Sequence, residues 1–239
     1  MFKPIKPGKG RTLDEAIDIS SYGHNPYNLF SPFTYSPDFK IPVPGQDEYA
    51  NSVESIWQGL KVINGQTDFS LFNKKPKKRK GHVEGHLYRD EILDIFDARL
   101  NIYKPSYFYY VEKYIPEEVK DDLLKKVFDE WEVYLHGIEN NLDLENPQPL
   151  AHSVFAAEYM NNYLNKKLEK VRKEIDLFYD SIKPEQTLAE PVSRAVKFFE
   201  NSSEIERVLA IHFLRSSARV RNIYHANYYC MLFDRLQRL

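Results

Sequence analysis

The sequence is poor in cysteine and has no long apolar run. Cys230 is the single cysteine among 239 residues, so the chain cannot form a disulfide within itself. No stretch approaches the roughly 20 apolar residues that a membrane-spanning helix needs, and Met1 to Arg11 lacks the apolar core of a secretory signal. We therefore expect a cytoplasmic protein with no membrane partner. We also expect Cys230 to be a buried thiol, because tyrosine, methionine and leucine flank it.

Several catalytic and metal-binding signatures are also missing. The chain has no Walker A loop, no G-x-S-x-G motif and no zinc ribbon. His82 and His86 lie four residues apart, but the glycine between them argues against a helical pair of zinc ligands, and no third ligand is evident. The sequence thus predicts neither a metal site nor a cofactor.

Charge is distributed unevenly along a chain whose formal net charge is −2. Six basic residues fall within seven positions: Lys74, Lys75, Lys77, Lys78, Arg79 and Lys80. The rest of the chain is acidic, so this basic run indicates a ligand that carries phosphate. A solvated loop is the commoner meaning of such a run, and the sequence leaves both interpretations open.

Proline and helical periodicity divide the chain into two parts. The segment from Ser20 to Gly45 is rich in aromatic residues, and prolines at positions 26, 32, 37, 42 and 44 exclude a helix from it. Such a segment suits the rigid wall of a pocket. Apolar residues then recur at helical spacing over Ser52–Ile63 and Arg89–Leu100. After Pro116 every periodic segment, including Glu117–Leu135, predicts helix, and none predicts a strand.

We therefore expect an α+β protein that is mostly helical. Residues 1–115 should hold a small β element and a pocket, and residues 116–239 should form a helical region packed on it. Near the end of the chain Arg215, Arg219 and Arg221 precede an aromatic stretch. Surface pairing and packing explain these arginines more simply than a ligand site does.

Glu54 is the residue that fits a plain core helix least well. It follows Ser52, a good N-cap, and lies in the first helical turn, where the helix dipole favours an ionised carboxylate. One interpretation is a surface carboxylate that compensates the dipole. The other is a carboxylate at the rim of a pocket whose floor is Trp57.

A family resemblance favours the second interpretation. The segments Ala50–Val62, Arg79–His86 and Asp97–Tyr107 together resemble an uncharacterised bacterial and phage family with the pattern ANSVE-x-IWQGLKV … KG-x-x-x-GH … AR-x-x-IY-x-P-x-Y. That family in turn resembles the NADAR N-glycosidases, whose hallmark is a Phe/Pro-rich loop before a helix opening with Thr/Ser-Val-Glu-His. Here Phe30–Phe33 and Ser52–Glu54 match the hallmark, while position 55 is Ser and not His. The hallmark also has a downstream Gln and Lys, which Gln58 and Lys61 match.

The resemblance implies a hydrolase that cleaves the N-glycosidic bond of a nucleotide-type substrate, in the setting of phage–host conflict. The substrate would be a modified nucleotide, an ADP-ribose adduct or a modified base in DNA. An ionised carboxylate near the sugar would stabilise the oxocarbenium-like transition state or activate water. The implied roles are catalysis by Glu54 with Asn51, base stacking by Trp57 or Tyr107, phosphate binding by Arg79, Lys80 and Arg99, and further substrate contacts from Lys61, Gly81, His86 and Tyr103.

Other functions remain open from the sequence. Pro44–Tyr49 resembles the Gly-Gln-Asp-Pro-Tyr loop of uracil-DNA glycosylases, although the proline is missing, so a DNA glycosylase acting on a modified base is one alternative. A non-catalytic nucleotide or nucleic-acid binding module is another, in which the basic run grips phosphate without chemistry. A structural or interaction protein is the third, and it predicts no pocket around Glu54 and Trp57.

Overall fold

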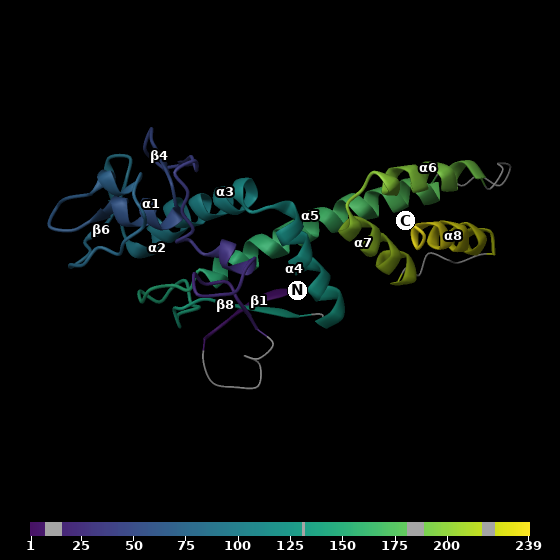
Figure 1. Ribbon diagram of the computed structural model, residues 1–239, viewed down its shortest axis with the longest axis horizontal. Helices are drawn as coiled ribbons and strands as arrows, with labels where there is room; N and C mark the ends of the chain where they lie inside the picture. Colours follow the sequence, from purple (N-terminus) through teal and green to yellow (C-terminus); the bar gives the residue numbers. More distant parts are fainter. Residues whose placement is uncertain (8–15, 131, 181–188, 217–222) are drawn as a thin grey trace. The chain divides into compact units, whose positions relative to one another are not determined.

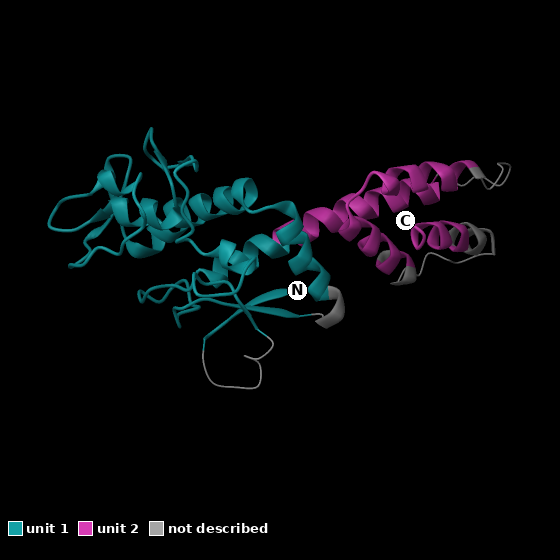
Figure 2. Ribbon diagram, in the orientation of Figure 1, with its two compact units in different colours: residues 1–161 teal, residues 162–239 magenta. Residues whose placement is uncertain are grey.

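The computed structural model describes residues 1–7, 16–130, 132–180, 189–216 and 223–239. They form two compact units, Met1–Asn161 and Asn162–Leu239, which Figure 2 colours separately. In the described chain every strand lies in the first unit, and the second unit is built from helices, so the expected α+β class with a helical C-terminal part is confirmed. Across the same residues, no helix combines the length and apolar character needed to cross a membrane.

The first unit contains three small sheets and several short helices (Figure 1). The strands are β1 (Phe2–Ile5), β8 (Val133–His136) and β2 (Ile17–Asp18) in a parallel sheet of that order; β3 (Ile41–Pro42) and β4 (Tyr49–Ala50) in a hairpin; and β5 (Lys61–Val62), β6 (Gly85–Tyr88) and β7 (Glu91–Leu93) in an antiparallel sheet. The helical elements are η1 (Tyr27–Phe30), α1 (Val53–Leu60), η2 (Phe69–Leu71), α2 (Ile95–Ala98), the π-helical turn η3 (Arg99–Tyr103), α3 (Lys104–Tyr114), α4 (Glu117–Glu130) and the start of α5 (Ser153–Asp180).

Three segments expected to be helical contain strands. The predicted helix Ser52–Ile63 ends at Leu60, and Lys61–Val62 form β5. Part of the predicted helix Arg89–Leu100 is the strand β7, and α2 begins only at Ile95, where the Asp94 side chain caps it by accepting from the backbone N–H groups of Phe96 and Asp97. The predicted helix Glu117–Leu135 ends early, and its last residues belong to β8. Periodicity cannot separate a short buried strand from a helix end, because a few apolar residues satisfy both patterns.

Strand β8 also changes the expected division of the chain. It lies between β1 and β2, with Phe2 opposite Val133 and Ile17 opposite Leu135. A strand from beyond residue 115 therefore completes a sheet that begins at the N-terminus. The first unit consequently extends to Asn161 instead of ending at residue 115.

Helix α1 is buried inside the first unit. Ser52 caps it by accepting a hydrogen bond from the backbone N–H of Ser55, at 3.0 Å. Every residue of α1 except Trp57 is buried, and the helix contacts β4, β6, η2, η3 and α3. Gly59 permits the approach to η2, because a Cβ atom there would lie 2.4 Å from the Phe72 ring.

Side chains hold the proline-rich segment, which can form few backbone ladders of its own. The buried hydroxyls of Tyr107 and Tyr110 on α3 donate to the carbonyl oxygens of Phe30 and Leu29, at 2.7 and 2.6 Å. Two residues after Phe30, the carbonyl of Pro32 contacts α1: it accepts a hydrogen bond from the backbone N–H of Glu54 at 3.0 Å. The aromatic loop is therefore fixed against the first turn of α1, as expected for a pocket wall.

The second unit contains the rest of α5 together with α6 (Ala189–Glu200), α7 (Glu204–Ser216) and α8 (Ile223–Leu236). Glu206 is buried in this unit and accepts from Lys170 at 2.8 Å and from the backbone N–H of Ser203 at 3.0 Å. Cys230 is exposed, so the expectation of a buried thiol is wrong. The buried side chains on this part of α8 are Leu232 and Leu236, and a residue two positions before Leu232 does not share their helix face. Arg219 and Arg221, and the side chain of Arg215, lie outside the described residues.

We predict that Gly59→Ala destabilises the protein by about 1–3 kcal/mol, because the added methyl group collides with the fully buried Phe72 ring and forces α1 and η2 apart. Gly65→Ala is the matched control, since a Cβ atom there meets nothing within 4 Å and only the positive φ of 71° opposes it. Denaturant unfolding measures both variants. Equal losses from the two would show that α1 and η2 are not tightly packed.

Candidate functional site

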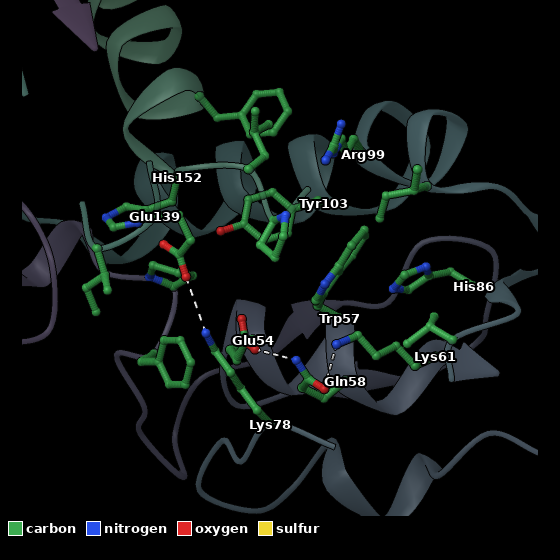
Figure 3. Close-up of a pocket in the computed structure, with 18 of the residues that line it drawn as sticks. Glu54, Trp57, Gln58, Lys61, Lys78, His86, Arg99, Tyr103, Glu139 and His152 are labelled. Atoms are coloured by element: carbon green, nitrogen blue, oxygen red, sulfur yellow. Dashed lines mark hydrogen bonds and ion pairs between the residues drawn. The ribbon is translucent and has the colours of Figure 1, made fainter. Parts of the chain in front are cut away.

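A cavity of about 520 Å³ opens beside α1 in the first unit (Figure 3). Its walls come from segments far apart in sequence. The lining includes Phe33 of the aromatic loop, Glu54, Trp57 and Gln58 of α1, Lys61 of β5, Lys78 of the basic run, His86 of β6, Arg99 and Tyr103 of η3, Glu139 after β8, and His152 and Phe155 at the start of α5. Its volume lies in the range of small-molecule binding sites.

Glu54 lies in the wall of this cavity and is 5% exposed. Its Oε1 atom accepts a hydrogen bond from the Gln58 amide one turn later, and its other carboxylate oxygen turns toward the cavity (Figure 3). Burial raises the pKa of Glu54 from 4.5 to about 7, against the opposing effects of the Gln58 hydrogen bond and of Lys61 and Lys78. The carboxyl therefore exchanges its proton near neutral pH.

Gln58 is held in one orientation by its neighbours. Its Oε1 accepts from Lys61 Nζ at 3.0 Å and from the backbone N–H of Arg79 at 2.9 Å, which leaves its amide N–H to face Glu54. Burial lowers the pKa of Lys61, while the charge of Glu54 raises it. The amide thus connects the buried carboxyl to a half-buried ammonium.

Trp57 and His86 form a stacked pair in the cavity wall, with ring centroids 3.7 Å apart and planes inclined at 29°. His86 is 1% exposed, and neither of its ring nitrogens has a hydrogen-bond partner in the described part of the chain. Burial, with a smaller contribution from Lys61, lowers the pKa of His86 to about 3. The imidazole is therefore neutral at physiological pH.

Tyr103 and Arg99 both belong to the π-helical turn η3, a distortion that often accompanies functional sites. The Tyr103 ring meets the Trp57 ring edge-on at 5.4 Å, and burial keeps the pKa of its hydroxyl well above 10. Arg99 instead donates to the carbonyl oxygens of residues 144, 146 and 148, at 2.6 to 2.8 Å. Arg99 therefore fixes the loop that closes this side of the cavity.

Lys78 and Glu139 line the cavity near Glu54, and their charges act on its carboxyl (Figure 3). Lys78 Nζ lies 3.3 Å from Glu139 Oε1, and its side chain is 60% exposed against 22% for Glu139. The ammonium also lies 5.7 Å from the centroid of the Phe33 ring. Two carboxyl groups and a cation thus meet at one end of the cavity.

The structure brings together six of the residues that the resemblance implied: Glu54, Trp57, Lys61, His86, Arg99 and Tyr103. Five others do not line the cavity. Asn51 donates to the carbonyls of Pro37 and Phe39, and Tyr107 is a core residue bonded to Phe30. Arg79 donates to the carbonyls of Gln58, Lys61 and Gln66, so its guanidinium secures the end of α1, and Lys80 and Gly81 are exposed.

The loop that resembles uracil-DNA glycosylases also lies away from the cavity. Pro44–Tyr49 connects β3 to β4, and none of its residues belongs to the lining. Tyr49 is 57% exposed, and Gln46 bonds the carbonyl of Arg89. The hairpin therefore offers no water-activating group to Glu54.

The lining residues that the sequence had not singled out as site residues include Gln58, Lys78, Glu139 and His152. Gln58 carried a usable signal, since a residue four positions after Glu54 shares its helix face. Lys78 was hidden among the other lysines of the basic run. Glu139 and His152 reach the cavity through the β8 sheet and α5, which no local pattern indicates. His152 Nε2 bonds the carbonyl of Ile19 at 3.0 Å, and burial lowers its pKa.

No cluster of three or more acidic, histidine or cysteine side chains suited to a metal ion occurs among the described residues. The groups present at the cavity can exchange a proton, stack on a flat ring and bind an anion. These are the properties of Glu54, of Trp57 and Tyr103, and of Lys78, respectively.

We predict that Glu54→Gln changes how stability depends on pH. The folded protein binds the Glu54 proton more tightly than the unfolded chain, so the free energy of unfolding falls as pH rises from 4.5 to about 7. The free energy of unfolding of Glu54→Gln minus that of the wild type should therefore be about 3 kcal/mol larger at pH 8 than at pH 4.5, for a pKa shift of this size. Denaturant unfolding at the two pH values measures this, with the exposed Glu91→Gln as control. A pH-independent difference would contradict the raised pKa.

His86→Phe should act on the acid side. The unfolded chain takes up a proton on His86 below pH 6.5, whereas the folded protein resists protonation until about pH 3. Because of His86, the free energy of unfolding of the wild type should fall by about 2–3 kcal/mol as the pH drops from 6.5 to 4.5. The phenylalanine variant should not show that loss. Unfolding measured at pH 7 and pH 4.5 tests this. Parallel declines in both proteins would show that His86 is protonated in the folded state.

Comparison with known proteins places the chain in a family. No curated protein and no solved structure matches it. The model of DUF6939, described as a family of unknown function, matches residues 11–156. This segment includes every residue that lines the cavity, from Ser21 to Phe155. Because it covers more than half of the 239 residues, the protein belongs to the DUF6939 family.

Proposed function

We propose that this protein hydrolyses the N-glycosidic bond of a nucleotide-type ligand, with Glu54 as the reacting carboxyl. The observation that carries the proposal is the position of Glu54, which is buried in the wall of an open cavity, faces that cavity, and has a pKa of about 7. Burial of a carboxyl beside aromatic rings and cations is costly for a purely structural residue. Such perturbed groups cluster at functional sites.

The size and lining of the cavity suit a nucleotide. A volume of about 520 Å³ accommodates a small molecule, whereas a duplex would not enter it. Trp57 and Tyr103 present flat rings on which a base can stack, and Phe33 and Phe155 extend the apolar wall. Lys61 and Lys78 supply positive charge on either side of Glu54.

The carboxyl is placed to act on the sugar. Hydrolysis of an N-glycosidic bond develops positive charge on the anomeric carbon and the ring oxygen of the sugar, and a nearby carboxylate stabilises that charge. Gln58 holds Oε1 of Glu54, so the second oxygen is available to the ligand or to the attacking water. A pKa near the working pH is the value at which a general base is most effective.

The reaction balances with one water molecule. The bond between the anomeric carbon and the base nitrogen breaks with its electron pair on the nitrogen, which takes up a proton. Glu54 removes a proton from water, and the water oxygen bonds to the anomeric carbon. The products are the free base and the hydroxyl sugar, and Glu54 returns its proton to solvent.

Chromatography of reactions with a panel of nucleosides, nucleotides and ADP-ribose adducts tests this proposal by detecting released base. We expect Glu54→Gln to reduce release by at least 10²-fold, because the amide cannot take a proton from water, while Glu91→Gln retains wild-type release. kcat/KM should rise with pH and level off above about 7, as Glu54 ionises.

Two results would overturn the proposal. One is base release that persists at the wild-type rate in Glu54→Gln. The other is binding of a nucleotide by wild type and Glu54→Gln with equal affinity and no release from any member of the panel. The second result would indicate a binding module.

A further inference from the structure

The cavity contains three cationic side chains that could bind an anionic ligand: Lys61, Lys78 and Arg99. Arg99 is already committed, since both terminal nitrogens donate to carbonyl oxygens of the loop around residue 146. Lys61 is half-buried, bonds Gln58, and serves as a nearby positive charge for Glu54. If Arg99 turned to a ligand, carbonyl oxygens of that loop would lose their donor. If Lys61 turned away, the protein would lose its hydrogen bond to Gln58 and the positive charge beside Glu54.

The Lys78 side chain is held less tightly than those of Lys61 and Arg99. Its single ion-pair partner among the described residues is Glu139, at 3.3 Å, and its side chain is 60% exposed. An ion pair this exposed contributes little net stability because water and salt screen it. The ammonium can therefore exchange one anion for another at low cost.

We propose that Lys78 is the phosphate-binding residue of the cavity. In the free protein its ammonium pairs with Glu139, and the phosphate monoester of a ligand takes over from that carboxylate as its partner. This inference rests on the proposed function and names its substrate class: a nucleoside monophosphate, and not a nucleoside. It also assigns one residue of the basic run a specific role. Of the six residues in that run, Lys78 is the one that lines the cavity within the described structure.

The exchange follows from charge. A phosphate monoester carries a charge of about −1.5 to −2 at neutral pH and three acceptor oxygens, whereas a carboxylate carries −1. Lysine binds such a group as a compact point charge on a flexible stem. Glu139 remains beside the phosphate after the exchange and repels it, so Glu139 limits the affinity that Lys78 provides.

Calorimetry in the Glu54→Gln background tests the inference without turnover. The probes are four ribonucleosides, their 5′-monophosphates, inorganic phosphate, and a single-stranded oligonucleotide that carries only phosphodiesters. We expect at least one monophosphate to bind about tenfold more tightly than its nucleoside. Adding Lys78→Ala should reduce that preference to within twofold, whereas Lys80→Ala, which removes an exposed lysine of the same run outside the cavity, should leave it intact. Adding Glu139→Gln should tighten monophosphate binding about threefold or more and leave nucleoside binding unchanged.

Several results would overturn the inference. They are a phosphate preference that survives Lys78→Ala, equal losses from Lys78→Ala and Lys80→Ala, weaker monophosphate binding in Glu139→Gln, no binding of any monophosphate, or tighter binding of the oligonucleotide than of every monophosphate. Competition by inorganic phosphate that requires Lys78 would support it.

Its failure is distinguishable from that of the proposed function. If phosphate binding depends on Lys78 but the wild-type protein releases no base, only the proposed hydrolase function is rejected. Base release that is indifferent to the phosphate and to Lys78 would reject only this inference.

Discussion

The burial of α1 is the constraint on which the rest of the first unit depends. This helix has eight residues, and all but Trp57 are buried, so its polar side chains must find partners inside the protein. Ser52, Ser55 and Gln58 do so within the first unit. Glu54 obtains a single amide partner, and the cost of removing its charge from water appears as a pKa near neutrality. The same packing that stabilises the helix thus raises the pKa of a carboxyl that lines the cavity.

The walls around this carboxyl are held by bonds to backbone carbonyls. A segment with prolines at 26, 32, 37, 42 and 44 cannot form extended ladders, and Asn51, Tyr107 and Tyr110 instead donate to its carbonyl oxygens. Arg99 does the same for the loop around residue 146. The resemblance suggested Asn51, Tyr107 and Arg99 for catalysis, stacking or phosphate binding, but these side chains are part of the scaffold.

The cations divide accordingly into structural and exchangeable groups. Arginine suits the first group, because its planar fork satisfies several carbonyls at once, as Arg79 and Arg99 show. Lysine suits the second, since one flexible ammonium can change partners, as proposed for Lys78. Lys61 and Lys78 flank the buried carboxyl and lower its pKa in opposition to burial. The electrostatics of the cavity thus depend on the two lysines, while its shape depends on the two arginines.

The sequence by itself determined the local features of this protein: the capped start of α1 at Ser52, the α+β class, and Glu54 as the anomalous residue. It also excluded an α-helix from the proline-rich segment, which contains the single 3-10 turn η1. These follow from capping chemistry, fixed proline φ angles and apolar periodicity, which act over a few residues. Only the tertiary structure decided which residue of the basic run lines the cavity, that Val133–His136 completes the N-terminal sheet, and that Glu139 and His152 line the same cavity as Glu54. The physical reason is that burial and long-range pairing depend on the whole fold, and no local pattern distinguishes a lysine bound to a carboxylate from one bound to water.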